Sequence, residues 1–333
     1  MQKGIIKLKN SPSIVSYASI GGKKESEGPL AGGFDLLDTT DRFDAETWEK
    51  SESEMQKRAL TYAMQKRGFA AQDVDALFAG DLMNQCTSSA YGLLSFDVPF
   101  FGLYGACSTA VEGLILSSLL LDTGHFNRTA AVASSHFYSS ERQFRYPIEY
   151  GGVRAPTAQW TVTGAGAFIL ENGGKGVRVS EVLPGKTQDK GITDLNNMGA
   201  AMAPAAIDTL TRYFSESGYT PDDFDLIATG DLGYEGYKIV TEFMRDKGFT
   251  ADTPYNDCGL MIFDREAQDV HAGGSGCGCS ATVLAAHILP AIESGRLNHV
   301  LLIGTGALMS PASVQQGLSI PGIGHLIHLE RGI

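Results

Sequence analysis

The chain repeats itself, and the repeat restricts the folds that it can adopt. Residues 68–82 read GFAAQDVDALFAGDL and residues 218–232 read GYTPDDFDLIATGDL, with six of fifteen positions identical at a constant offset of 150. In each copy the end of a helical pattern is followed by a turn and by a short apolar strand that stops at Gly-Asp-Leu. A shared unit at this spacing indicates two similar halves.

A second, weaker echo lies further along each half. Residues 107–134 and 278–305 both show a long apolar helix pattern that ends at an acid, a small polar residue and Gly, followed by an apolar strand. The Gly is expected just after the helix, where it adopts a left-handed conformation. Both helix patterns are apolar nearly all round, which indicates burial on most sides. Alternating strands and helices favour parallel strands, with two sheets enclosing these two helices.

Composition and charge exclude several classes of protein. The 333 residues are 43% hydrophobic and 19% charged, as in an ordinary globular protein. The formal net charge is -12, so we expect no nucleic-acid partner and no direct contact with anionic lipid. Five cysteines without framework spacing predict reduced thiols. No segment has the pattern of a signal peptide or a membrane span, so we expect a soluble protein.

Cys107 is the most suggestive single residue. It stands in YGACSTA, residues 104–110, between an apolar run and the first of the two buried helix patterns. At a helix N-terminus, backbone N–H groups and the helix dipole favour a thiolate. The position therefore suits a nucleophile, or what remains of one.

The order of these elements, with GACSTA opening the buried helix of the first half, resembles the thiolase superfamily over essentially the whole chain. TVTGAGAFILE, GGSGCGCSAT and GIGHLIHLER resemble the glycine-rich strand, the glycine-rich loop and the last strand of that fold. The resemblance implies an α/β protein with a duplicated thiolase-like fold, in which two mixed sheets enclose buried helices in a layered α-β-α-β-α arrangement. We expect an N-terminal half of residues 1–190, carrying Cys107, and a C-terminal half of residues 191–333. It also implies a homodimer, whose sheet edge we expect from the first-half strands after Cys107.

Condensing enzymes of this superfamily pair the cysteine with a His and an Asn, or with two His, from the second half, which activate the thiolate and bind the thioester oxygen. The first partner should follow the strand that ends at Gly230, where the sequence reads ATGDLGYEG. The second should lie in the glycine-rich loop, where Ser275 and two cysteines stand. Neither position holds His or Asn. We therefore expect a binding protein rather than an enzyme, with no catalytic residue and with Cys107 as a vestigial nucleophile.

Several segments resemble one family of the superfamily more sharply, among them FAGDLMNQ, SSERQFRYPIEYGG, MGAAMAPAA and HAGGSGCGCSA. This is a family of sporulation proteins of endospore-forming bacteria. The resemblance implies binding of pyridine-2,6-dicarboxylic acid (dipicolinic acid), alone or as its calcium chelate, during its transport into the developing spore. It further implies membrane proteins of the same transport system as partners, a cytoplasmic or forespore location at the spore inner membrane, and a link to spore germination.

Residues 134–154, SSHFYSSERQFRYPIEYGGVR, are dense in Arg, Tyr and Phe and should lie over the mouth of the pocket. Arginines make bidentate contacts to carboxylates and tyrosines stack on rings, which suits a planar aromatic dicarboxylate. The alternative, weighted equally, is a dimer-contact loop with surface ion pairs. The candidate ligand-binding residues are Cys107, His136, Arg142, Arg145, Tyr146, Asp257, Cys258 and Ser275.

Other polar residues suit structural roles. Cys277 and Cys279 lack a second pair of ligands at metal spacing, so we expect neither a metal nor a cofactor. Asp81 and Asp231, paired by the repeat, are expected to cap a helix or a loop, and Asp257 alternatively forms a turn.

Two other functions stay open. One is an acyl-thioester condensing enzyme with Cys107 as nucleophile and a relocated base, and the other is a structural docking subunit without a ligand.

Overall fold

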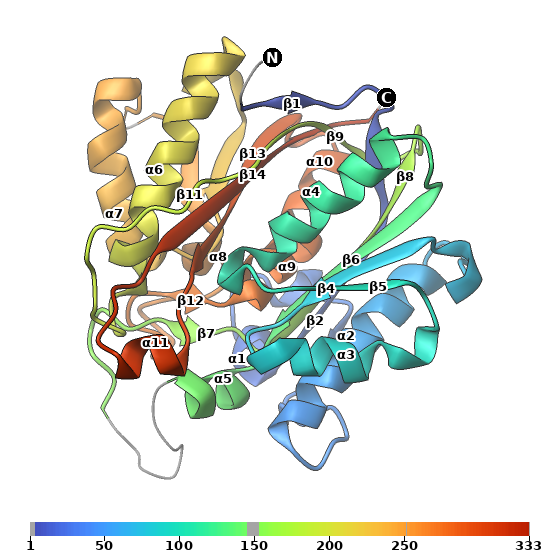
Figure 1. The fold of residues 1–333 in the computed structure, drawn as a ribbon, viewed down its shortest axis with the longest axis horizontal. Helices are drawn as coiled ribbons and strands as arrows, with labels where there is room; N and C mark the ends of the chain where they lie inside the picture. The colour runs from blue at the N-terminus through green and yellow to red at the C-terminus, as the bar shows by residue number, and fades with distance from the viewer. Residues whose placement is uncertain (1–3, 145–152, 251, 333) are drawn as a thin grey trace.

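The computed structural model describes residues 4–144, 153–250 and 252–332, and Figure 1 shows its fold. The ten main strands are β2 (Pro12–Gly21), β4 (Ala76–Gly80), β5 (Phe100–Leu103), β6 (Arg128–Ser135), β8 (Gly164–Asn172), β9 (Val177–Leu183), β10 (Leu226–Thr229), β11 (Tyr255–Asp257), β13 (His299–Ala307) and β14 (Gly322–Glu330). Four short strands accompany them: β1 (Ile6–Lys7), β3 (Leu36–Leu37), β7 (Trp160–Thr161) and β12 (Gly274–Ser275). The helices are α1 (Lys23–Ser26), α2 (Trp48–Gln65), α3 (Thr87–Gly92), α4 (Thr109–Asp122), α5 (Phe137–Phe144), α6 (Met198–Ser217), α7 (Gly233–Met244), α8 (Cys258–Met261), α9 (Cys277–Val283), α10 (Leu289–Glu293) and α11 (Pro311–Gln315).

The ten main strands form two groups with the same order, β5-β4-β6-β8-β2 and β11-β10-β13-β14-β9. In each group three parallel strands are followed by two antiparallel ones. The groups meet where β2 pairs with β9 over two residue pairs, so the two mixed sheets run into one another. The predicted duplication is confirmed. The second group begins with β9, and the boundary at residue 190 stays a prediction.

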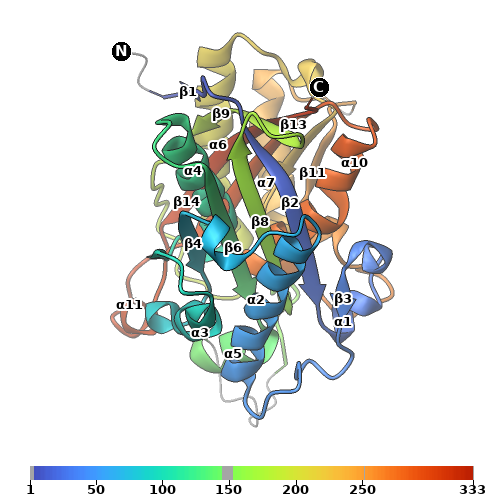
Figure 2. The same cartoon turned by 90° about the vertical axis from the view of Figure 1, so that its right-hand side faces the viewer.

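The layers follow from which faces of the sheets are apolar. Helix α2 covers the outer face of the first sheet (Figure 2), and α6 covers the outer face of the second, with α7 packed beside it. Helices α4 and α9 lie between the sheets, where α4 contacts strands of both (Figure 1). The layered α-β-α-β-α arrangement of a thiolase-like fold is therefore confirmed.

The repeated segment has the same structure in both halves. Gly68 and Gly218 both adopt positive φ, 68° and 83°, where they turn the chain out of α2 and α6. The Asp75 carboxylate accepts two backbone N–H groups at the start of β6, and the Asp225 carboxylate accepts two at the start of β13. These identical letters of the repeat thus set identical turns.

The chain enters α4 through a strained turn. Ala106 has φ of 50°, in the left-handed region that residues with a Cβ avoid. Ala106, Cys107 and Ser108 form a single 3-10 turn, η5, that leads directly into α4. Cys107 therefore lies at the N-terminus of the buried helix, as predicted, and Gly124 after α4 and Gly295 after α10 take the expected left-handed conformation.

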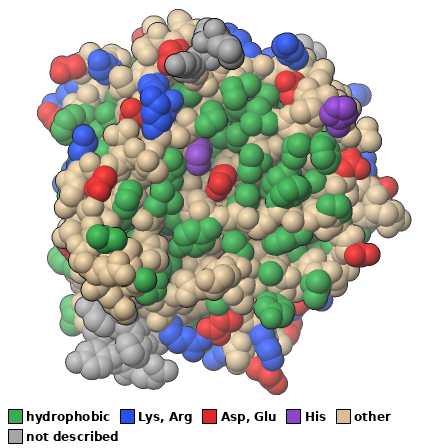
Figure 3. Space-filling view, viewed as in Figure 1, with side chains coloured by type: hydrophobic (Ala, Val, Ile, Leu, Met, Phe, Trp, Pro, Cys, Tyr) green, Lys and Arg blue, Asp and Glu red, His purple; other side chains and the backbone are tan. Residues whose placement is uncertain are grey.

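Among the described strands, the free edge of the first sheet is β5, which precedes Cys107, so the prediction of an edge from the strands after Cys107 is wrong. Helix α4 crosses the sheet and delivers β6 between β4 and β8. Beside the β5 edge lie large exposed side chains, the β5 patch, and Figure 3 shows apolar side chains gathered over the middle of this face. The β5 patch consists of Tyr91, Leu94, Phe100, Phe101 and Tyr104.

The sequence predicts no membrane span and reduced thiols. Within the described residues, we find no helix with the length and apolar character that crossing a membrane requires. All five cysteines are free thiols.

Candidate ligand site at Cys107

Cys107, from the first half, meets a carboxylate of the second half. Asp231 lies in the loop after β10, close enough to the Cys107 thiol for the two groups to shift each other's pKa. Its carboxylate also accepts hydrogen bonds from the Thr305 hydroxyl at 2.9 Å, the Ser275 hydroxyl at 3.1 Å and the Gly276 N–H at 2.9 Å. Asp231 is 1% exposed. The loop after β10, the end of β13 and the glycine-rich loop thus converge on one buried acid.

The electrostatics of this cluster oppose a thiolate. Burial raises the pKa of the Cys107 thiol well above its usual value, and the Asp231 carboxylate raises it further by charge repulsion and by accepting the thiol hydrogen. The Gly276 N–H and the Ser275 hydroxyl act in the opposite direction, but less strongly. Burial also raises the pKa of Asp231, although the Cys107 thiol favours its ionised form. The cysteine is therefore held as a neutral thiol at neutral pH.

Asp257 braces the loop that carries Asp231. Its buried carboxylate accepts hydrogen bonds from the N–H groups of Leu232 at 2.8 Å and Gly233 at 2.9 Å, and from the Thr229 hydroxyl at 2.6 Å. It also caps the N-terminus of α8. Burial raises the pKa of Asp257 to about 7, although these donors favour the carboxylate. Asp257 therefore acts through Asp231, by fixing where its loop runs.

A cavity of about 50 Å³ opens beside Cys107, room for a few water molecules. Both halves contribute to its wall, which includes α5, the glycine-rich loop and the end of β13. Glu141 is the charged residue among the described residues of this wall. The lining residues are Leu82, Tyr104, Ala106, Cys107, Ser140, Glu141, Phe144, Thr161, Met198, Ser275, Ala307 and Met309.

The structure brings Cys107 and Ser275 together and places other candidates elsewhere. Cys258 is fully buried beneath the site and does not line the cavity. Arg142, on α5, forms an ion pair with Glu49 of α2 and is likewise absent from the cavity wall. Arg145 and Tyr146 lie outside the described residues. Whether any of these residues holds a ligand stays a prediction.

His136 has a packing role. Its ring is fully buried and lies 5.4 Å from the Trp48 ring, and its Nε2 is 2.8 Å from the carbonyl oxygen of Asp41. Burial lowers the pKa of His136 to about 4, so the ring is neutral at neutral pH. It does not line the cavity with Cys107.

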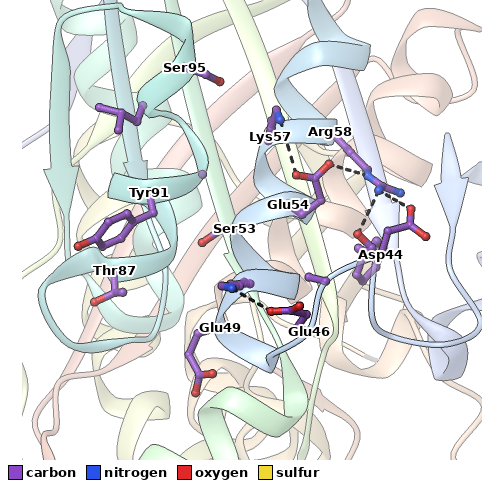
Figure 4. A pocket seen from close by; sticks show the side chains of 15 residues that line it. Asp44, Glu46, Glu49, Ser53, Glu54, Lys57, Arg58, Thr87, Tyr91 and Ser95 are labelled. Atoms are coloured by element: carbon purple, nitrogen blue, oxygen red, sulfur yellow. Dashed lines mark hydrogen bonds and ion pairs between the residues drawn. The ribbon is translucent and has the colours of Figure 1, made fainter.

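A larger, open groove of about 1050 Å³ lies between α2, α3 and the loop before α2 (Figure 4). Its basic side chains already have partners: Lys50 pairs with Glu46, and Arg58 pairs with Asp44 and Glu54. Lys57 lies 3.8 Å from Glu54. Since these charges satisfy one another, the groove offers less to an anionic ligand than its size suggests.

Sequence reasoning missed Asp231 as a member of the site. Asp231 and Asp81 stand in the same Gly-Asp-Leu motif, so the sequence predicts capping for both. A signal existed, because Asp231 stands in the loop where the resemblance places the first partner of the cysteine. Also missed were the apolar and aromatic lining residues Tyr104, Met198 and Met309, which are brought together from separate segments.

Comparison with known proteins places the chain in a family. The family model described as Stage V sporulation protein AD (SpoVAD) matches residues 2–330. The chain is 42% identical to Stage V sporulation protein AD of Bacillus subtilis (strain 168) over 318 residues, 96% of this chain and 94% of that protein.

Solved structures of low sequence identity share the fold. Acetamide-bound OleA of Xanthomonas campestris superimposes with a TM-score of 0.60 at 14% identity, covering 98% of this chain and 100% of that one. 3-Oxoacyl-[acyl-carrier-protein] synthase III from Aquifex aeolicus VF5 gives 0.58 at 12% identity, covering 96% and 100%. These likenesses concern the fold alone. By its sequence over nearly its whole length, the chain belongs to the Stage V sporulation protein AD family.

Proposed function

We propose that this protein binds pyridine-2,6-dicarboxylic acid without transforming it, as the binding component of the system that moves this ligand into the developing spore. Membrane proteins of the same system would hold it at the spore inner membrane. Membership in a sporulation family supports the setting. The observation that carries the non-catalytic part is the buried Asp231 carboxylate beside the Cys107 thiol, which raises the pKa of that thiol.

Acyl transfer by a cysteine requires the thiolate as nucleophile. A histidine beside the thiol would take its proton and form a favourable ion pair with the thiolate. A carboxylate in the same buried place opposes that charge instead. Ser275, at the second motif position, donates its hydroxyl hydrogen to Asp231. The described side chains therefore favour a pocket that binds over one that activates the cysteine.

The side chains of the cavity wall suit the ring of the ligand in chemistry, and at about 50 Å³ the cavity must widen to admit it. Tyr104 and Phe144 offer aromatic surface, and most other lining residues are apolar, as in many small-molecule sites. The two carboxylates need positive charge, and Arg145 follows Phe144 directly in the chain. Binding as the calcium chelate would need less positive charge from the protein, because Ca²⁺ cancels the two charges of the ligand.

Calorimetric titration tests this function. Dipicolinate with and without Ca²⁺, benzene-1,3-dicarboxylate and acetyl-CoA are each titrated into the protein. We expect binding of dipicolinate, tighter with Ca²⁺, and weaker binding of the benzene analogue, which lacks the chelating ring nitrogen. Transfer of the acetyl group from acetyl-CoA to the Cys107 thiol, with release of CoA, would favour the condensing enzyme. If none of these ligands binds, the docking subunit becomes the better proposal.

We also propose a homodimer joined through the β5 patch. Strand β5 pairs only with β4 among the described strands, and an unpaired apolar edge strand favours pairing with β5 of a second copy across a two-fold axis. Phe101 is 49% exposed there. Sedimentation should give a dimer for the protein and for Phe243→Glu, which changes an exposed residue of α7, and a monomer for Phe101→Glu. A monomeric unmodified protein at micromolar concentration contradicts this proposal.

A further inference from the structure

Two histidines and a glutamate meet on the second sheet, away from Cys107. His299 is the first residue of β13 and lies directly opposite Glu330, the last residue of β14. His328 stands two residues before Glu330 and so points to the same face of the sheet. This face packs against α6, whose Tyr213 reaches His328. None of these residues takes part in the proposed ligand site.

The spacing of the three side chains matches that of metal ligands. His299 Nδ1 lies 3.3 Å from His328 Nε2, and His328 Nε2 lies 3.7 Å from Glu330 Oε1. One ligand atom from each residue falls within 4.8 Å of the others. Two imidazole nitrogens bound to a tetrahedral ion at about 2.0–2.1 Å would lie about 3.3 Å apart, which is the separation observed here.

A buried network orients His328 for this role. The Tyr213 hydroxyl donates to Glu181 Oε2 at 2.8 Å and lies 3.3 Å from His328 Nδ1. Because the hydroxyl hydrogen is used, the oxygen accepts from Nδ1–H, which leaves the lone pair of Nε2 facing His299 and Glu330. A hydrogen bond to the far nitrogen is the usual way in which proteins fix a metal-binding histidine.

The charges around the cluster tolerate a cation. Arg178 pairs with Glu330 through Oε2, which leaves Oε1 toward His328. Lys7 pairs with Glu181 at 3.0 Å, and the Asp225 carboxylate accepts the backbone N–H of His299. Three carboxylates thus face two basic groups.

Access to the cluster comes from the side of His299. His299 is exposed, whereas the side chain of His328 is fully buried and that of Glu330 is 12% exposed. An ion can therefore enter beside His299, and water can occupy a fourth position.

We propose that His299, His328 and Glu330 bind a divalent transition-metal ion of the zinc type, with water as the fourth ligand. Two imidazoles and one carboxylate select such an ion over Ca²⁺ or Mg²⁺, which prefer oxygen ligands. The ion would tie the end of β14 to the start of β13 and so stabilise the second sheet.

Titration of the chelator-treated full chain tests this site. Zn²⁺ should bind at one ion per chain and raise the melting temperature, and Ca²⁺ and Mg²⁺ should do neither. Co²⁺ should bind at the same place and give the visible absorption of a tetrahedral ion. If no ion binds at tens of micromolar Zn²⁺, or if Co²⁺ gives the spectrum of a hexaaqua ion, the proposal is overturned.

Two variants locate the ion. His299→Ala changes an exposed side chain and should weaken Zn²⁺ binding by about tenfold or more, while His125→Ala, at an exposed histidine elsewhere, should leave it unchanged. Tyr213→Phe removes the group that orients His328 and should weaken binding by about 10-fold while retaining the Co²⁺ spectrum. Equal affinity in the His299→Ala and His125→Ala variants would show adventitious binding and sink the idea.

Discussion

The two Gly-Asp-Leu motifs have the same sequence and both follow the end of a strand, yet their aspartates have different hydrogen-bond partners. Asp81 accepts the N–H and hydroxyl of Ser89 at 2.8 and 2.6 Å, and the N–H of Met83 at 2.8 Å. It therefore caps α3 and its own loop, as predicted. Asp231 instead receives donors from Thr305, Ser275 and Gly276 and faces the Cys107 thiol.

The edge strands explain this difference. In the second half Thr229 pairs with Asp257, and in the first half its repeat equivalent Ala79 pairs with Gly102. Asp257 bonds the N–H groups that follow Asp231, whereas a glycine has no side chain to do so. Asp81 therefore accepts the backbone N–H groups of its own loop. Asp231 does not have to do so, and its carboxylate faces the first-half cysteine. One residue on a neighbouring strand thus decides what an identical motif can do.

The largest expected effect is the loss of stability that follows from replacing Asp257. In Asp257→Ala, the buried N–H groups of Leu232, Gly233 and Gly259 lose their acceptor, at about 1–3 kcal/mol each when left unpaired. We expect the free energy of unfolding to fall by about 3 kcal/mol or more in urea denaturation. Asp252→Ala, at an exposed residue of the same segment, should change it by less than about 0.5 kcal/mol. Equal stability of the two variants would show that the hydrogen bonds of Asp257 do not hold the loop that carries Asp231.

The reactivity of Cys107 should distinguish the two aspartates. Asp231→Asn removes the negative charge beside the thiol, which lowers the pKa of Cys107 and increases the thiolate fraction. We expect alkylation of Cys107 to accelerate about tenfold or more at pH 7.5, since a shift of one pKa unit changes that fraction about tenfold. The unmodified protein should react about tenfold faster per unit of pH up to at least pH 9, because the pKa of Cys107 lies well above 9.0.

Peptide mass spectrometry measures this rate separately from that of Cys86, which is half-buried. Asp81→Asn is the matched control, being the same change in the same motif, and should alter the Cys107 rate by no more than about twofold. If both variants react alike, the contact between Asp231 and Cys107 does not control the thiol.

The sequence predicted the duplication, the layers and the glycine turns because local letters set them. Gly124 and Gly295, which follow the two buried helix patterns, need no distant partner to be recognised. The different hydrogen-bonding roles of Asp81 and Asp231 could not be predicted from the sequence, because they depend on the pairing of Thr229 with Asp257 across two strands. The β5 edge was likewise misplaced, because strand order is set by the crossover of α4 rather than by sequence order.

Segment 134–154 could be predicted only in part. The position of α5 at the cavity follows from its place after β6, and Phe144 and Glu141 do line the cavity. The partner of Arg142 is Glu49, which is 93 residues away in the chain, and no local sequence pattern predicts such a pair.

Positive charge for the proposed ligand is expected from the first half. Arg145 follows the lining residue Phe144, and second-half residues such as Met309 bring apolar groups to the wall. Arg145→Ala should weaken dipicolinate binding about tenfold or more, since a charge-assisted hydrogen bond contributes about 1.5–3 kcal/mol and ~1.4 kcal/mol is a factor of ten. Arg145→Lys should restore binding only in part, because the guanidinium fork is lost. An affinity within twofold in both variants would show that Arg145 does not hold the carboxylates and would direct attention to the second-half lining residue Ser275.

The smallest effect is expected at Arg142, which belongs to the same segment but pairs with Glu49. The side chains of Arg142 and Glu49 are 45% and 30% exposed, so water screens the pair and its contribution to stability should be about 0.2–1 kcal/mol in a double-mutant cycle. Arg142→Ala should change dipicolinate affinity less than twofold, because the guanidinium is held at α2 rather than at the cavity wall. A tenfold loss in Arg142→Ala with no loss in Glu49→Ala would mean that Arg142 leaves its partner for the ligand. In that case α5 would supply charge to the first-half side of the cavity, and the contrast between the halves would extend from the two aspartates to the ligand itself.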